Sequence, residues 1–178
     1  MKKAWLAVPL SAALLLGSGF PAGTALDNAT QNEASAATKK YYFKNNVAKL
    51  TDVKIKITKV KFVTKKDAFK YDCFNPVVIF YYETTNLTGS PAVTPSDAWM
   101  AVFAVYQDNK TNYMNELEFM GYPERKYDKT MHKRIKKGRT VKNAVLYELS
   151  DTKTPVLLKA YKGYDGTYLG KKTYKVKF

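Results

Sequence analysis

The stretch that decides the fold is LTDVKIKITKVKFVTKK, residues 50–66 of the 178-residue chain. In its first half Val53, Ile55 and Ile57 alternate with polar residues. Successive side chains of a β-strand point to opposite faces, so this alternation predicts a strand with one buried side and one wet side.

The second half of the stretch changes parity. Val60 and Phe62 become the apolar pair, separated by Lys61. A side-chain period of two cannot absorb that change without an extra residue. We therefore expect a β-bulge, or a crossover between sheets, near residues 58–59.

Further strands are expected downstream. Residues 77–82 and 98–106 are apolar on both faces, as in central strands, and residues 140–149 alternate. Residues 156–161 and 172–178 complete the set of strands, and an Asp-Gly turn at 165–166 joins them. In the last strand Tyr174, Val176 and Phe178 are expected to face inward. About seven short strands with little helical periodicity predict an all-β fold, an antiparallel β-sandwich.

Two connecting segments are less clear. Residues 107–110, Gln-Asp-Asn-Lys, follow an apolar strand where the chain must reverse, and Asp and Asn side chains stabilise turns. A turn is therefore favoured over a ligand-contacting loop. Residues 112–134 are compatible with a short strand, a helical turn or a long loop, and the sequence does not choose between them.

The N-terminus has the three parts of a secretory signal peptide: a basic start, an apolar stretch and small residues. We expect residues 1–25 to be removed, although cleavage after Ala36 or Ala37 is an alternative. No cysteine lies where a lipid anchor would attach, so a released protein without a transmembrane anchor is expected. Residues 26–49 are predicted to be a flexible leader, and residues 50–178 a single domain.

The chain is strongly basic, with 30 Lys and Arg against 15 Asp and Glu. Such a field favours anionic partners, which for an exported bacterial protein are wall polymers or lipid head groups rather than nucleic acid. The alternative is a solvated surface whose lysines protect sheet edges. One dense basic run is the candidate anion-binding site, and it contains Lys133, Arg134, Lys136, Lys137, Arg139 and Lys142.

Tyrosines suggest a second candidate surface. Tyr161, Tyr164 and Tyr168 surround the predicted last hairpin and form a candidate contact patch, because tyrosine is common at recognition surfaces. A second basic run follows this hairpin, at Lys171, Lys172, Lys175 and Lys177.

The sequence gives little support for a catalytic or metal-binding site. His132 is the only histidine and Cys73 the only cysteine, which is too few ligands for a zinc site. His132 lies in a basic segment that matches no nucleophile motif, and Cys73 is expected to be a buried thiol or, alternatively, to pair between chains. We therefore predict no catalytic, metal or cofactor-binding residues and no enzyme activity.

The strand and turn residues resemble a known family. The stretches FYYETTNLTGSPAVTPSDAWMAVFAVYQDNK (80–110) and AVLYELSDTKTPVLLKA (144–160) are similar to small secreted or lipid-anchored immunoglobulin-like domains of unknown function in Gram-positive bacteria. The resemblance implies an immunoglobulin-like β-sandwich of the immunoprotective extracellular protein type, and it implies no catalytic residues.

These observations predict a secreted, non-enzymatic binding module at the bacterial cell envelope. Its partner is expected to be an anionic wall polymer or a surface protein, bound through a basic, tyrosine-bearing surface. The alternatives are a released inhibitor or host-facing factor and, less favoured, a small secreted hydrolase.

Overall fold

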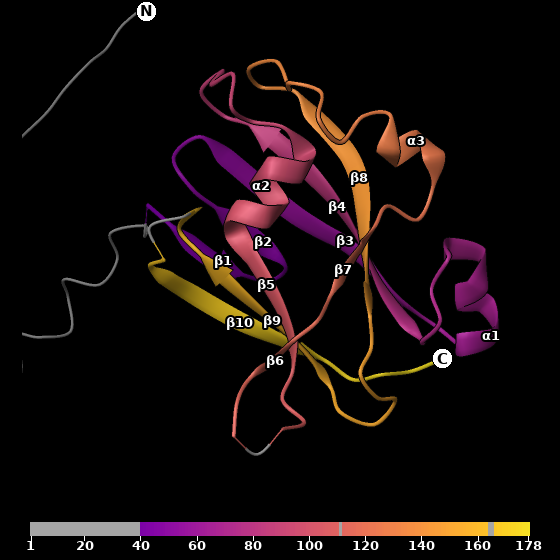
Figure 1. Cartoon of the computed structure of the whole chain (residues 1–178). Helices are drawn as coiled ribbons and strands as arrows, with labels where there is room; N and C mark the ends of the chain where they lie inside the picture. The colour runs from indigo at the N-terminus through magenta and orange to yellow at the C-terminus, as the bar shows by residue number, and fades with distance from the viewer. Residues whose placement is uncertain (1–39, 111, 164–165) are drawn as a thin grey trace, which may run out of the picture. The chain divides into compact units, whose positions relative to one another are not determined.

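The computed structural model describes residues 40–110, 112–163 and 166–178. These residues form two antiparallel sheets that pack against each other (Figure 1). The predicted signal peptide and most of the predicted leader lie outside the described residues.

Ten strands build the two sheets within the described residues. The six-stranded sheet contains, in spatial order, β1 (Tyr42–Lys44), β2 (Val47–Lys49), β3 (Val53–Val63), β4 (Val77–Asn86), β8 (Thr140–Glu148) and β7 (Phe119–Gly121). The four-stranded sheet contains β10 (Tyr168–Tyr174), β9 (Val156–Tyr161), β5 (Phe103–Gln107) and β6 (Asn115–Glu116). The helices are α1 (Lys65–Ala68), the 3-10 turn η1 (Phe69–Tyr71), α2 (Pro95–Val102) and α3 (Arg125–Asp128).

This architecture confirms the predicted all-β antiparallel sandwich. The strand count exceeds seven because β1, β2, β6 and β7 are only two or three residues long. All four lie in segments for which the sequence predicts no strand with certainty: β1 and β2 in the predicted leader 26–49, and β6 and β7 in residues 112–134. The immunoglobulin-like classification stays a prediction.

The predicted bulge in β3 is present. Ile57 pairs with Tyr82 and Lys59 with Tyr81, so Thr58 is an extra residue on its strand. The Thr58 hydroxyl donates to the Tyr81 carbonyl over 3.1 Å, which fixes the bulged residue to the neighbouring strand. Beyond the bulge Val60 and Phe62 turn back toward the core.

The predicted strand 98–106 is wrong in its first half, which belongs to helix α2. The Thr94 side chain accepts a hydrogen bond from the backbone N–H of Asp97, and Pro95 occupies the first turn. An N-cap threonine followed by proline favours a helix start. Ala98 and Val102 then lie four residues apart on the buried side of the helix.

The domain also begins earlier than residue 50. β1 and β2 form a hairpin within the segment assigned to the leader, and Phe43 packs edge-on against Phe103 at 5.4 Å. Ala48 is fully buried. At the other end the chain leaves β10 at Tyr174, so Phe178 is 58 % exposed rather than inward-facing.

The main core lies between the sheets and is centred on Trp99 of α2. Its ring lies 4.6 Å from Tyr82 and 4.7 Å from Phe103, which belong to different sheets, and its indole N–H donates to the Tyr147 hydroxyl over 2.8 Å. Helix α2 therefore ties the two sheets together. Burial raises the pKa of Tyr82 and of Tyr147 well above the ordinary range.

A second, smaller core covers the outer face of the six-stranded sheet. Ile79 and Leu146 pack there beneath the segment that carries α1 and η1, together with Ala68. Cys73 is fully buried in this cluster as a free thiol, and its S–H donates to the Tyr71 carbonyl over 3.4 Å. Burial, followed by the nearby Glu148, raises the pKa of the thiol.

The polar segment 107–110, which begins with the last residue of β5, is a structural connection. Gln107 is fully buried, and its amide group donates to the carbonyls of Asp151 and Thr154 and accepts from the N–H groups of Ser150 and Asp151. Asn109 donates to the Asp151 carboxylate over 2.6 Å. β5 and β6 pair antiparallel across this segment, as the predicted turn requires. Its polar side chains thus fasten the β8–β9 loop to the end of β5.

Among the described residues no helix is long and apolar enough to cross a membrane.

Candidate anion-binding surface

The loop before β8 carries most of the predicted anion-binding residues. Its only buried side chain is Ile135, whose N–H donates to the Val93 carbonyl over 3.0 Å. Gly138 has a φ of 70°, which allows a tight turn after Lys137. One buried apolar anchor and a glycine turn therefore hold this loop while its charged side chains face solvent.

Asn86 at the end of β4 fixes the position of the loop. Its side chain is fully buried and donates to the carbonyls of Ser90 and Ile135, at 2.9 and 2.8 Å. Its side-chain oxygen accepts from the N–H groups of Thr88 and Gly89. A buried amide that uses both its donor and its acceptor locks three chain segments in one geometry.

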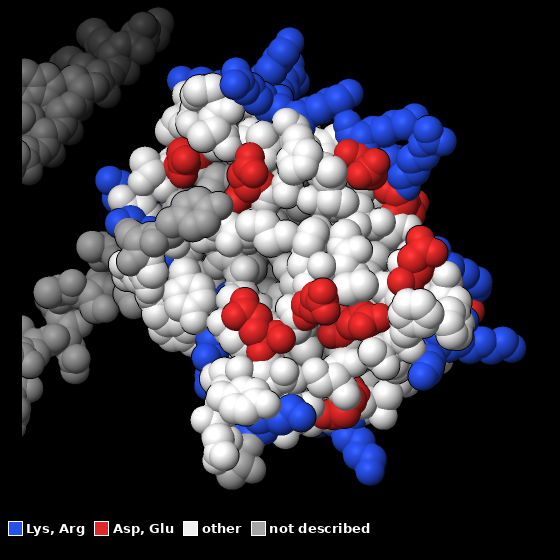
Figure 2. Space-filling model, in the orientation of Figure 1, with Lys and Arg blue, Asp and Glu red and all other residues white. Residues whose placement is uncertain are grey.

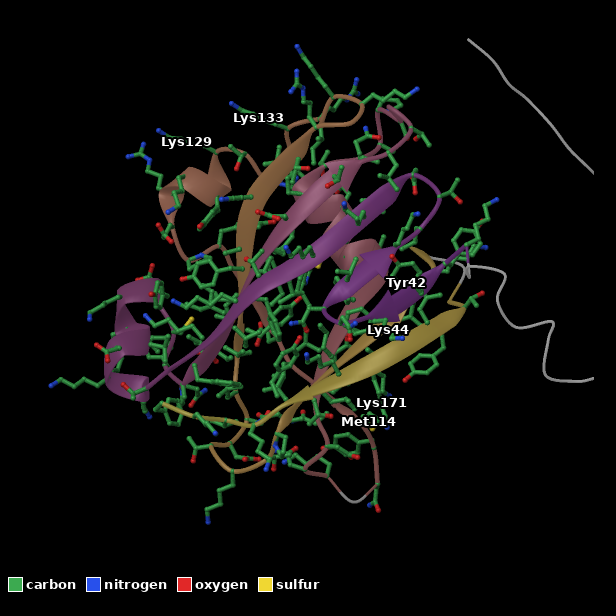
Figure 3. The ribbon with its side chains drawn as sticks, turned by 180° about the vertical axis from the view of Figure 1, so that it is seen from behind. Tyr42, Lys44, Met114, Lys129, Lys133 and Lys171 are labelled. Carbon is green, nitrogen blue, oxygen red and sulfur yellow. The ribbon has the colours of Figure 1, made fainter. Side chains whose placement is uncertain are left out.

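All six predicted residues of this run are exposed. Figure 2 shows lysine and arginine side chains gathered along the rim above β8 and α3, and Figure 3 shows Lys129 and Lys133 projecting from the same end of the domain. Lys142 lies 3.9 Å from Glu83. Within the described residues the other five form no ion pair at 4.0 Å or less, so their charge is available to a ligand.

The sheet adds two lysines that sequence reasoning did not connect to this site. On the outer face Lys56 pairs with Glu83, and Glu83 pairs with Lys142. Lys54 lies opposite Thr85, two residues along the strand and therefore on the same face. Since neighbouring strands are about 4.8 Å apart, Lys56 and Lys142 stand roughly 10 Å apart with one carboxylate between them.

We call this surface the basic face. It consists of Lys54, Lys56, Lys133, Arg134, Lys136, Lys137, Arg139 and Lys142. Glu83 is the acidic partner within it. An array of cations that extends from a loop onto a sheet suits a long polyanion better than a single small anion.

The predicted tyrosine patch lies elsewhere. Tyr161 and Tyr168 face each other across β9 and β10, with ring centroids 5.9 Å apart, on the outer face of the four-stranded sheet. Tyr164 lies outside the described residues. The basic face belongs to the six-stranded sheet, so the structure does not unite the two predicted sites into one surface.

Tyr106 extends the tyrosine patch, and sequence reasoning missed it. Lys159 lies over its ring at 4.8 Å. Burial, then the nearby Glu116 and Tyr161, raise the pKa of Tyr106 to about 12. The alternation of β5, in which Tyr106 falls between buried Val105 and Gln107, is the signal that could have placed it outside.

Cys73 and His132 lie in different surroundings, since Cys73 is fully buried and His132 is exposed. Cys73 lies beside the segment bonded to Glu148, at the end of β8, whereas the exposed His132 lies in the loop before β8 begins. Thr130, two residues before His132, lies 3.4 Å from the Asn143 amide in the middle of β8, whereas the segment after Cys73 is bonded to Glu148 at the end of that strand. In the described part of the chain, no three His, Cys, Asp or Glu side chains gather in a way that could hold a metal ion.

Comparisons with known proteins give a family and a fold. A family model described as "Domain of unknown function (DUF5067)" matches residues 28–162. The chain matches none of the curated proteins. It is similar to a solved structure described as a "putative lipoprotein from Staphylococcus aureus subsp. aureus NCTC 8325", with a TM-score of 0.64 and 21 % identity over 76 % of this chain and 92 % of that one. At this identity the likeness concerns the fold.

Proposed function

Since this chain belongs to the DUF5067 family, we propose that it is a non-enzymatic binding module of the bacterial cell envelope, held there by an anionic wall polymer. The fold likeness to a staphylococcal structure described as a lipoprotein supports the location. The basic face supports the choice of partner.

The observation that carries the proposal is the charge arrangement of the basic face. Eight cations extend from the loop before β8 onto β3, with Glu83 as their acidic neighbour. Polyphosphate chains bind such arrays by releasing condensed counterions, which makes binding steeply dependent on salt. The loop is held by Asn86 and Ile135, so little ordering entropy is lost when a polymer binds.

Cosedimentation with isolated Gram-positive cell walls tests the proposal. We expect retention at low salt, release as sodium chloride is raised, and little retention on walls stripped of teichoic acid. Lys136→Glu with Lys137→Glu should lower retention by about tenfold, because two attractive charges become repulsive.

The matched control is Lys65→Glu with Lys66→Glu. It makes the same change in net charge on exposed residues of α1, outside the basic face. If both double variants lose retention equally, net charge alone drives binding and the basic face has no specific role. Retention that does not change with salt would contradict the proposal outright.

A further inference from the structure

A groove lies on one open side of the sandwich, between β3 and the chain that continues from β10. Its lining combines the half-buried Val60, Phe62 and Tyr174 with the exposed Lys61, Lys175 and Lys177, around a volume of about 650 Å³. A second hollow of about 280 Å³ shares Lys61 and Phe62 with it and continues toward α1. The second basic run of the sequence thus contributes to a concave surface, separate from the basic face.

Backbone groups on both sides of this groove lack strand partners. β2 pairs with β3 only over residues 54–56, so among the described residues β3 beyond Ile57 is bonded to β4 alone. In the same part of the chain β10 is bonded to β9 alone. Residues 175–178 form no backbone–backbone hydrogen bond with any described residue. Such free edges are templates for an added strand.

The β1–β2 hairpin explains why the edge is free only here. It closes the neighbouring part of the open side, where a Cβ added at Gly170 would lie 3.2 Å from the Phe43 carbonyl oxygen. The hairpin turns at Asn45 and Asn46, and Asn46 accepts a hydrogen bond from the Tyr174 hydroxyl over 3.0 Å. That contact marks the end of the hairpin and the start of the groove.

The positive charge of the groove indicates which kind of ligand it can bind. None of the residues that line the larger hollow is acidic, and the one carboxylate of the smaller hollow, Asp67, is paired with Lys70 at 2.7 Å. A second copy of this chain, with a net charge of +15, would be repelled. Lysines at a strand edge discourage neutral or basic strands but attract acidic ones.

We propose that this groove binds an extended acidic peptide segment of another protein, which adds as a strand to the free edge of β3. Alternate side chains of an added strand point to opposite sides. Apolar residues of the peptide would pack on Phe62 and Tyr174, and the acidic residues between them would face Lys61, Lys175 and Lys177. The expected ligand is therefore a short stretch of alternating apolar and acidic residues.

The test uses a fluorescein-labelled peptide of alternating valine and glutamate, with binding measured by fluorescence anisotropy. Two companion peptides carry glutamine in place of glutamate, or methyl groups on alternate backbone nitrogens. We expect the acidic peptide to bind, the glutamine peptide to bind about tenfold more weakly, and the methylated peptide to lose binding because it cannot complete the backbone ladder. Bound peptide should also slow hydrogen exchange in residues 58–63.

Two double variants locate the site. Lys175→Glu with Lys177→Glu should weaken peptide binding about tenfold, because it reverses two charges of the groove on exposed residues outside any strand. Lys136→Glu with Lys137→Glu should leave peptide binding unchanged while it reduces retention on cell walls. The two proposals therefore fail separately.

Three results would overturn this inference. Equal binding of the methylated peptide would show capture by charge without strand addition. Equal losses in the two double variants would place the peptide on the basic face. Exchange protection of residues 58–63 by dodecyl phosphate but not by the peptide would assign the groove to an anionic amphiphile.

Discussion

Asp151 shows how single residues set the shape of the loops. Its carboxylate accepts hydrogen bonds from the N–H groups of Lys153 and Thr154, at 2.8 and 2.6 Å, and from the Asn109 amide. Burial opposes ionisation, but these donors outweigh it and lower the pKa to about 2 from an ordinary 3.8. The ionised carboxylate is thus part of the folded loop.

This carboxylate predicts a pH dependence of stability. A folded-state pKa below the unfolded value means that the stabilisation is complete above about pH 4 and is lost as the pH falls toward about 2. Asp151→Asn should lower the free energy of unfolding by about 1 kcal/mol at neutral pH. In urea denaturation the difference from wild type should shrink as the pH is lowered to about 2.

The control for this prediction is Asp108→Asn, which changes an exposed carboxylate near the same loop. It should leave the free energy of unfolding nearly unchanged at both pH values. A constant difference between wild type and Asp151→Asn across the whole pH range would contradict the assigned role of the charge.

At the scale of elements, the bulge in β3 makes a prediction about deletions. Removing Thr58 leaves Ile57, Val60 and Phe62 in strict alternation, so every remaining side chain keeps its face. We expect this deletion to fold and to change the free energy of unfolding by about 1 kcal/mol or less. Thermal and urea denaturation followed by circular dichroism would measure it.

Deletion of Lys61 is the matched comparison. It removes a residue where the ladder is regular, so Phe62 and Val63 exchange faces and the strand loses contacts in both cores. We expect a loss of about 3 kcal/mol or more. Equal effects of the two deletions would show that the extra residue at position 58 has another structural role.

The elements also show what the sequence could and could not predict. Alternation predicted β3 and β8 and located the bulge, because a period of two is a local property of the chain, and β4 was predicted from a short run that is apolar on both faces. Helix α2 was missed because an apolar run of nine residues fits a buried strand as well as a buried helix. Its signal was Thr94-Pro95 with Asp97 three residues after the cap, which is a helix start rather than only a turn.

The candidate site was only partly predicted, because local sequence reveals some of its residues and strand pairing supplies the others. The exposed cations of the loop before β8 lie close together in sequence, within residues 133–139, so the local composition reveals them. Lys54 and Lys56 join them only through the pairing of β3 with β4 and of β4 with β8. Register between distant strands cannot be deduced from local patterns. For the same reason, the sequence did not show that the tyrosine patch and the basic face lie on different sheets.

At the scale of the whole molecule, Trp99 reports on the joining of the two sheets. The chain contains two tryptophans, and removal of residues 1–25 would leave only Trp99. Its ring contacts Tyr82 and Phe103, which belong to different sheets, so it should become exposed only when the sheets separate. We expect fluorescence and circular dichroism to report one coincident unfolding transition.

The comparison variant for this prediction is Tyr147→Phe, which removes the acceptor of the Trp99 hydrogen bond but keeps the ring. It should lower the midpoint of unfolding for both signals together, at a cost of about 1–2 kcal/mol. Fluorescence that changes before the dichroism signal would show that α2 detaches while the sheets persist.

The two-residue turn of the β1–β2 hairpin has a consequence for relatives of this protein. Because β1 and β2 are short, the hairpin covers only part of the open side of the sandwich and leaves the groove uncovered. If β1 and β2 were each two residues longer, the turn would lie beyond Lys59. The hairpin would then cover the backbone of β3 that has no strand partner here. The length of the β1–β2 hairpin can be counted in any related sequence. It should therefore distinguish domains in which the edge of β3 is free to bind a strand from domains in which the hairpin covers that edge.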